Sequence, residues 1–246
     1  MQSATGGIEL RALRLNHLQI FLQSLRGMKL SSQGAFIAVI KSLFGFACKI
    51  GYLAYNLGSL LRLPKTPNDV AERIVGEGDI QRLLALTTKP RDGTLLQLAY
   101  VSGLRIAELS ALRWRCFARR EDGAVLSVIA KGRKLRHIFL PEHTAMAVAA
   151  LRNGAPDSAP IFLSRHNKPL STNRMHSIVK QTARRAGLPP TFSMHWCRHA
   201  HASHAMDRGA PVHVVQQTLG HASLATTCRY VHCKPSASSA QYIVPS

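Results

Sequence analysis

Acidic residues are scarce in this chain. Its 246 residues hold 12 Asp or Glu against 32 Lys or Arg, which leaves a formal net charge of +20 at pH 7. The imbalance grows toward the C-terminus, where the stretch from Ser158 to Ser246 holds ten Lys or Arg and a single acid, Asp207. Because like charges repel one another, such an excess weakens a free-standing domain. The usual partner of such a surface is a polyanion, most often a nucleic acid.

Cysteine pairs and long apolar runs are also missing. The five cysteines are an odd number with no CxxC spacing, which argues against a disulfide framework or a structural zinc site and favours a reducing cytosol. The most apolar stretch, residues 35–61, is interrupted by Lys41 and Lys49, and the first fifteen residues hold no signal-peptide core. We therefore predict no membrane span and a cytoplasmic, nucleoid-associated protein.

Hydrophobic residues make up 46% of the chain, enough for a folded core. Residues 8–63 have a helical period, and residues 63–70, with two prolines and few apolar side chains, read as a linker. We predict a helical domain over residues 1–63, a linker over 64–71 and a second domain over 72–246.

The second domain changes its period once. Helical segments, one of them ended by Gly103, precede two β-rich runs at 125–130 and 135–140, which flank a basic turn. Helices resume at 142–151 and continue to 224–231, with Gly220 ending one of them. The predicted fold class is mainly α with a small antiparallel sheet.

Four short segments carry reactive side chains. In SGLRIAEL, Arg105 opens a helix and Glu108 lies three residues on, on the same face; an ordinary surface ion pair would look the same. In AKGRKLR, a basic hairpin tip can contact DNA phosphates, as can any solvated turn. In HWCRHA, His195, Arg198 and His199 share one helix face, which an anion would organise. In LGHASLATTCRYVH, Tyr230 taken alone would be a core or interface residue.

Taken together and in this order, the four segments resemble the boxes of the tyrosine recombinases, the phage integrase superfamily. Arg198 precedes His221 by 23 residues, and His221 precedes Tyr230 by nine, as in bacterial site-specific recombinases. The resemblance covers residues 80–232 and extends faintly to the family's helical core-binding domain. It implies a two-domain DNA clamp that works as a homotetramer on two double-stranded DNA sites, without a cofactor or metal.

The resemblance also implies a role for each reactive residue. Tyr230 is the nucleophile that forms a 3′-phosphotyrosine, Arg105 and Arg198 clamp the phosphate, and His221 donates to it. His195 is the base toward Tyr230, and Lys131 the acid toward the 5′-oxygen. Glu108 and His199 support them. The predicted DNA contacts are Arg133, Lys134, Arg136, Lys41 and Arg174.

The sequence departs from the family pattern at a few places. Trp196, Cys197 and Ala200 replace the usual acid, aliphatic residue and Thr, the N-terminal domain is one helix short, and sixteen residues follow Tyr230. Two alternatives stay open: a type IB topoisomerase-like nickase, and an inactive DNA-binding remnant of a mobile element. A metal site at Cys197, His201 and His204, on the opposite arc of the same helix, lacks an evident fourth ligand.

Overall fold

The chain forms two compact units, Met1–Asn68 and Asp69–Ser246. The computed structural model describes residues 8–64, 75–129 and 135–228, and each unit is described by itself. Most of the predicted linker lies outside the described residues, so the domain limits stay a prediction.

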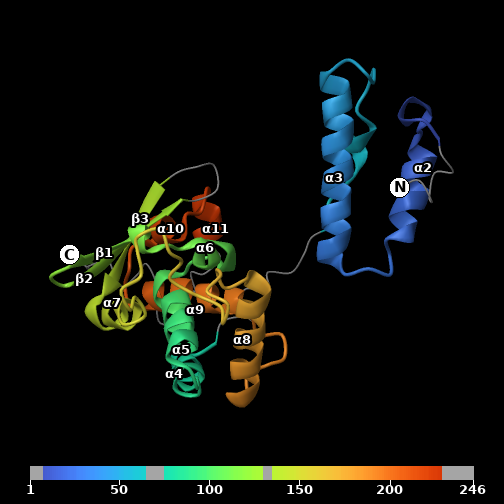
Figure 1. Cartoon of the computed structure of the whole chain (residues 1–246). Helices are drawn as coiled ribbons and strands as arrows, with labels where there is room; N and C mark the ends of the chain where they lie inside the picture. Colours follow the sequence, from blue (N-terminus) through green and yellow to red (C-terminus); the bar gives the residue numbers. More distant parts are fainter. Residues whose placement is uncertain (1–7, 65–74, 130–134, 229–246) are drawn as a thin grey trace, which may run out of the picture. The chain divides into compact units, whose positions relative to one another are not determined.

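The first unit is helical (Figure 1). A turn of 3₁₀-helix, η1 (Leu10–Ala12), precedes α2 (Leu15–Ser24) and α3 (Leu30–Lys49), and a second one, η2 (Leu57–Leu60), follows. Leu18 of α2 packs with Ile37, Ile40 and Phe44 of α3 in the core of this unit. These side chains recur at the helical period that the sequence predicted.

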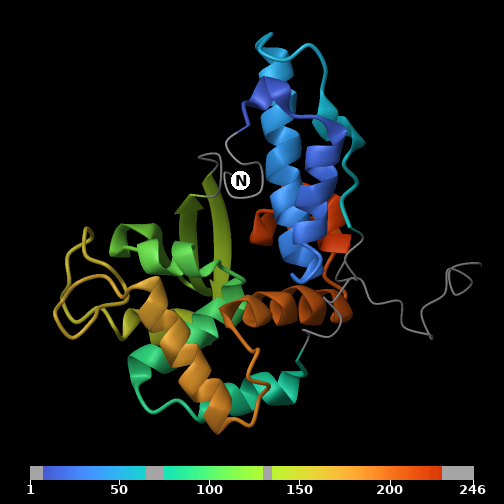
Figure 2. The same cartoon turned by 90° about the vertical axis from the view of Figure 1, so that its right-hand side faces the viewer.

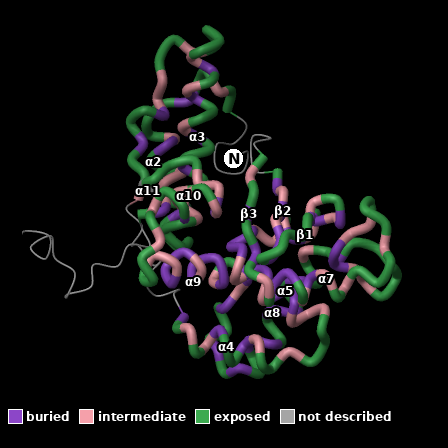
Figure 3. Tube along the Cα trace, turned by 90° about the vertical axis from the view of Figure 1, so that its left-hand side faces the viewer, coloured by how far each residue is buried: buried purple, intermediate pink, exposed green. Residues whose placement is uncertain are grey.

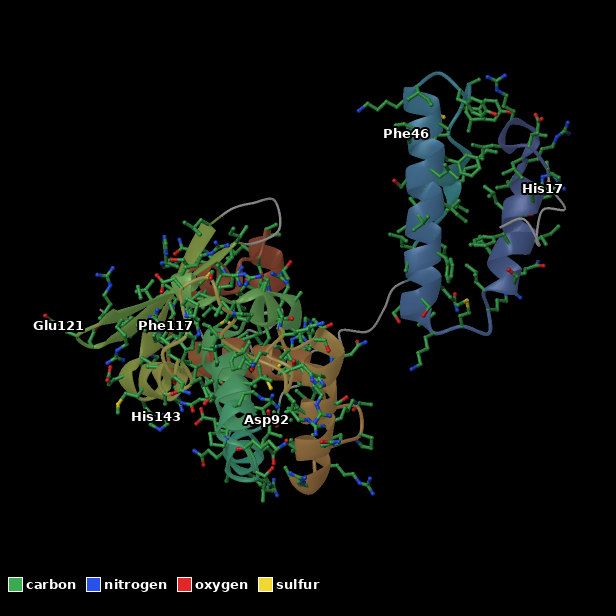
Figure 4. The ribbon with its side chains drawn as sticks, in the orientation of Figure 1. His17, Phe46, Asp92, Phe117, Glu121 and His143 are labelled. Carbon is green, nitrogen blue, oxygen red and sulfur yellow. The ribbon has the colours of Figure 1, made fainter. Side chains whose placement is uncertain are left out.

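Helix α3 is more apolar than its buried face requires. Its large exposed side chains include Phe36, Val39 and Phe46, the last of which is labelled in Figure 4. By length and composition alone, Leu30–Lys49 could cross a membrane, with 22% of its most apolar 18-residue window buried. One helix of this kind is weak evidence for a membrane span and does not overturn the prediction that the chain has none. The core helix of a soluble protein meets the same criterion, and so does a signal sequence near the N-terminus.

The second unit begins with three helices. They are α4 (Glu77–Ala85), α5 (Pro90–Ser102) and α6 (Ile106–Ala111), followed by a 3₁₀ turn, η4 (Trp114–Cys116). Proline at the start of α5 is tolerated because the first helical N–H has no partner inside the helix. Gly103 ends α5 in the left-handed conformation, with φ of 60°, as the sequence predicted.

A three-stranded antiparallel sheet of order β1-β2-β3 follows. Its strands are β1 (Phe117–Arg120), β2 (Gly123–Ile129) and β3 (Leu135–Pro141). Strands β2 and β3 are the predicted hairpin, with Leu126 opposite Ile138 and Val128 opposite Arg136. The buried residues Ala124, Leu126 and Val128 alternate along β2, so one face of the sheet meets the core. Strand β1 was not predicted; the turn after it, with Glu121, lies at the outer end of the sheet (Figure 4).

The remaining elements are helices. They are α7 (Glu142–Ala149), α8 (Thr172–Arg185), α9 (Met194–Asp207), α10 (Val212–Leu219) and α11 (Leu224–Cys228). Figure 2 shows α9 (orange) from the side, extending away from the base of the sheet. Helices α5 and α9 pack against each other, and Figure 3 shows that buried residues concentrate along both. A central pair of this kind holds the ends of several neighbouring elements close together.

Candidate active site

The first site residue, Arg105, lies where α5 ends and α6 begins. Its backbone is extended and forms the N-cap of α6, as predicted. The Arg105 N–H donates to Glu108 Oε2 at 2.9 Å, and its side-chain Nη1 donates to Glu108 Oε1 at 3.2 Å. Arg105 keeps 40% of its side chain exposed, whereas Glu108 keeps 11%. The predicted pairing is present, and it leaves much of the Arg105 guanidinium accessible.

Glu108 has a second and tighter partner in Arg136 of β3. The two terminal nitrogens of Arg136 donate to the two carboxylate oxygens at 3.1 and 2.8 Å, and only 9% of its side chain is exposed. Burial, the largest influence, raises the pKa of Glu108, but the hydrogen bonds and charges of Arg136 and Arg105 outweigh it and lower the pKa overall. The sequence predicted Arg136 as a DNA contact on a basic tip; the structure instead places its guanidinium inside the site.

Arg198 of α9 is almost fully buried, with 2% exposed. Its Nη1 donates to Gly103 O at 2.6 Å, and its Nη2 donates to Leu219 O at 2.7 Å. These carbonyls end α5 and α10, where helices carry unpaired acceptors and partial negative charge. The guanidinium therefore joins two helix C-termini.

The two histidines predicted to flank Arg198 on α9 differ in their burial. His199 is buried and His195 is exposed, and their rings meet edge to face with centroids 4.6 Å apart. The sequence predicted one shared face for His195, Arg198 and His199. On that face the structure buries Arg198 and His199 and leaves His195 exposed.

His221 follows the left-handed Gly220, whose φ is 65°. Its Nδ1 lies 2.9 Å from Thr227 Oγ1. Burial above all, and then the charges of Arg198, Arg105, His195 and Arg136, lower the pKa of His221 to about 4. Arg198 donates to the carbonyls of Gly103 and Leu219, two residues before Arg105 and His221, so the structure brings Arg105, Arg198 and His221 together around one site.

Two of the six predicted catalytic residues lie outside the described residues. Lys131 belongs to the segment between β2 and β3, together with the predicted DNA contacts Arg133 and Lys134. Tyr230 comes two residues after the end of α11. Their placement stays a prediction.

The other predicted DNA contacts differ in their availability. Lys41 is in the first unit, where its Nζ donates to Leu61 O at 2.6 Å. Arg174 is exposed near the start of α8. It lines a groove together with Lys89, Arg165 and His166. Both residues stay predicted phosphate contacts.

The alternative metal cluster is not assembled. Burial raises the pKa of the Cys197 thiol to about 12, and a thiol must ionise to ligate a metal. His204 Nδ1 instead lies 3.0 Å from the Tyr100 hydroxyl. Within residues 8–64, 75–129 and 135–228, no three His, Cys, Asp or Glu side chains are grouped to hold a metal ion.

The sequence analysis missed two hydrogen-bonding partners of histidines that it had singled out. Tyr100 is the partner of His204, and Thr227 is the partner of His221. Thr227 lies three residues before Tyr230 in a segment that the sequence did single out, but nothing in its type marked it. Its position on the helix beside His221 is what gives it a role.

We expect the second unit to lose stability as the pH falls from about 6.5 to 5. Burial lowers the pKa of His201, as of His221, to about 4. An unfolded histidine takes its proton near pH 6.5, so the unfolded chain binds protons first and unfolding becomes more favourable in this window. The full loss for His201 is up to about 3 kcal/mol, and His221 adds less because solvent screens it.

Urea unfolding of wild type and His201→Gln at pH 7.5, 6.5 and 5.5 measures this loss. The variant should show a shallower fall in unfolding free energy over the same range. An equal fall in both proteins would contradict the prediction.

Comparison with known proteins agrees with this site. The Phage integrase family matches residues 73–236. The Tyrosine recombinase XerC of Xylella fastidiosa (strain 9a5c) is 31% identical over 242 residues, which cover 94% of this chain and 80% of that protein. XerC of Xanthomonas axonopodis pv. citri (strain 306) is 31% identical over 226 residues, covering 88% of this chain and 72% of that protein.

Two solved structures share the fold. The XerH site-specific recombinase, solved bound to its difH substrate before cleavage, has a TM-score of 0.76 at 19% identity and covers 95% of this chain and 71% of its own. The Tn1549 transposon integrase, solved with circular intermediate DNA, has a TM-score of 0.73 at 16% identity, covering 97% and 88%. The resemblance predicted from four sequence boxes is confirmed: this protein belongs to the phage integrase family, the tyrosine recombinases.

Proposed function

We propose that this tyrosine recombinase cuts and rejoins double-stranded DNA at specific sites through a 3′-phosphotyrosine formed on Tyr230. The observation that carries the proposal is the convergence of Arg105, Arg198 and His221 on one site: Arg198 donates to Gly103 O and Leu219 O, which lie two residues before Arg105 and His221. A phosphodiester undergoing displacement gathers negative charge on its non-bridging oxygens. Preorganised donors of this kind stabilise such charge, and the loss of one costs about 2.7–4 kcal/mol.

The arginines are the phosphate clamp in this proposal. Arg105 is held by Glu108, and 40% of its side chain is exposed. Arg198 is fixed by two carbonyls, each of which accepts from one of its terminal nitrogens. Because a guanidinium stays protonated at any working pH, these two groups supply the positive charge that Mg²⁺ supplies to other phosphoryl-transfer enzymes.

His221 is proposed as a neutral donor. With its pKa near 4, its ring is uncharged at pH 7. When the Thr227 hydroxyl donates to Nδ1, the ring proton resides on Nε2, which can then donate to a phosphate oxygen. Thr227 is thus the residue that selects the tautomer.

Tyr230, His195 and Lys131 carry the bond changes. The Tyr230 oxygen attacks phosphorus as His195 accepts the phenolic proton, and the bond to the 5′-oxygen breaks as Lys131 gives that oxygen a proton. Ionising tyrosine at pH 7 without help costs roughly 4 kcal/mol, which the cations around the site offset. The phosphotyrosine ester conserves the bond energy, so a 5′-hydroxyl can reverse the step without ATP.

DNA binding is proposed to use both units as a clamp. On the second unit, the groove beside α8 and a neighbouring hollow share Lys89 and Arg174, which places two cations next to each other at the surface. Arg133 and Lys134 remain proposed contacts at the hairpin. We propose that four subunits act on two sites in the cytoplasm, at the nucleoid, as strand exchange between two duplexes requires.

A covalent adduct made in the presence of EDTA tests the proposal. Protein–DNA adducts recovered from the native host and sequenced identify the target site. A nicked suicide substrate of that sequence loses its 5′-hydroxyl fragment after cleavage and traps the protein on the 3′ end. We expect an adduct that survives denaturation and forms equally well in excess EDTA, since no proposed group needs an ion.

Other outcomes favour the alternatives. If EDTA abolished the adduct and a divalent ion restored it, the proposed metal-independent mechanism would be wrong. Cleavage and relaxation without strand transfer between two marked duplexes would favour the topoisomerase-like nickase. DNA binding at the recovered site with no adduct would favour the inactive remnant.

A further inference from the structure

In the part of the chain that the structure describes, one ion pair is buried at a position that stability alone does not explain. Arg136 and Glu108 form a two-pronged pair between β3 and α6, with 9% and 11% of their side chains exposed. Burying two charges costs solvation free energy that their attraction often only balances, so such pairs are weak evidence for a stabilising role. The Nε of Arg136 is in addition a buried donor with no acceptor among the residues that the structure describes. The burial of the Arg136 cation at this cost in solvation free energy therefore needs another explanation.

Arg136 contacts two of the segments that build the site. Beyond Glu108, its guanidinium lies against the backbone of Gly220: a Cβ added there would sit 2.8 Å from Nη1 and 3.3 Å from Cζ. Gly220 directly precedes His221, and Glu108 directly contacts Arg105. Arg136 itself is in the second position of β3, just after the segment that contains Lys131. One side chain thus joins the strand next to Lys131, the corner with Arg105 and the turn with His221.

Arg136 also determines how the Glu108 carboxylate distributes its hydrogen bonds between the two arginines. The carboxylate receives two hydrogen bonds from the Arg136 fork, one from the Arg105 side chain and one from the Arg105 backbone. If the Arg136 fork were absent, both carboxylate oxygens could turn to Arg105 and take up its terminal nitrogens. That rearrangement would neutralise Arg105 and move it away from a phosphate.

We propose that Arg136 is a positioning residue of the recombinase: it holds Glu108 in the geometry that keeps the Arg105 guanidinium open to the scissile phosphate. The inference rests on the proposed function, because it assigns Arg136 a role in the same cleavage step. It replaces the role of a direct DNA contact predicted from sequence. Arg136 acts through Glu108 and does not touch the reacting atoms.

The test compares Arg136→Met with Arg119→Met. Arg119 of β1 forms a two-pronged pair with Glu142, at 3.0 and 2.8 Å, on the same sheet but with 43% of each side chain exposed and no contact with the site. Single-turnover cleavage of the suicide substrate should slow about 10²-fold in Arg136→Met, the typical penalty for a misplaced catalytic group. Arg119→Met should cleave at the wild-type rate, and both variants should bind the DNA as wild type does.

The double variant Arg136→Met/Glu108→Gln separates positioning from general damage. If Arg136 acts through Glu108, the double variant cleaves no more slowly than the slower single variant. Multiplying defects would overturn the proposal, as would a wild-type rate in Arg136→Met. Arg136→Lys, which keeps the charge but not the fork, covers the case in which the methionine variant does not fold, and it should also cleave slowly while melting near wild type.

A readout independent of cleavage distinguishes this inference from the proposed function. The pKa of Glu108, followed by NMR of a labelled carboxyl carbon, should rise in Arg136→Met and remain at the wild-type value in Arg119→Met. A wild-type protein that forms no adduct would contradict the proposed function, yet this titration would still decide whether Arg136 governs Glu108. An unchanged Glu108 titration in Arg136→Met overturns the inference in either case.

Discussion

Tyr230→Phe is expected to abolish the covalent protein–DNA adduct while leaving folding and DNA binding almost unchanged. The substitution removes one oxygen and keeps the ring, so the packing of the segment changes little. Without that oxygen no phosphotyrosine can form, and the loss should be complete rather than partial. On the nicked suicide substrate, wild type should give a band that survives denaturation. The phenylalanine variant should give none, yet shift the same DNA in a native gel.

The other four tyrosines serve as controls: Tyr52, Tyr55, Tyr100 and Tyr242. Tyr100→Phe is informative because its hydroxyl contacts His204 inside the second unit, so this variant tests for loss of stability without loss of the nucleophile. Tyr242 is the strongest competitor because it is also near the C-terminus, although it lies in a Ser-rich segment with no matching spacing. An adduct formed by Tyr230→Phe but not by Tyr242→Phe would show that the assignment is wrong.

Features set by neighbouring residues could be predicted from the sequence. Gly103 and Gly220 interrupt an apolar period, and both end helices with positive φ. Arg105 and Glu108 are three residues apart on one helix, so their pairing needs no knowledge of the fold. The basic turn between two β-rich runs predicted the β2–β3 hairpin for the same reason.

Strand β1 could not be found in this way. Its sequence, FARR, has a single buried side chain and three exposed ones, so it shows neither alternation nor an apolar run. It becomes a strand because β2 offers it a free edge, with Phe117 opposite Leu126. Partner-dependent pairing of this kind is invisible to a local pattern.

Burial of charge was the other failure of the sequence analysis. Arg136 has its partner 28 residues earlier in the chain, and Arg198 finds one of its carbonyl acceptors 95 residues away. The sequence predicted Arg136 as a DNA contact and Arg198 on an anion-binding helix face, and a local pattern predicts burial of neither, since arginine is almost never buried unless paired. Only the meeting of β3 with α6, and of α9 with the ends of α5 and α10, provides the acceptors that bury them.

Duplex DNA affinity is expected to fall about 10³–10⁵-fold between 50 and 200 mM salt, if about 6–10 phosphates are contacted. Even if each of the 12 acids neutralised one base, 20 of the 32 Lys and Arg would keep their charge. Each phosphate that such a cation neutralises releases condensed counterions, and added salt opposes that release. Binding measured at several salt concentrations on one duplex gives the slope. A nearly flat titration would show that the excess charge serves something other than DNA.

A matched pair of variants shows whether the slope reports particular contacts or only total charge. Arg174→Gln and Arg119→Gln each remove one positive charge from the second unit. Arg174 is exposed in the basic groove beside α8, whereas Arg119 is already committed to Glu142. If Arg174 meets a phosphate, its loss should reduce the salt slope by about 1 and weaken binding to all sequences alike. Removing Arg119 frees Glu142 but breaks no phosphate contact, so its slope should match wild type. Equal slopes in the two variants would place the groove outside the DNA interface.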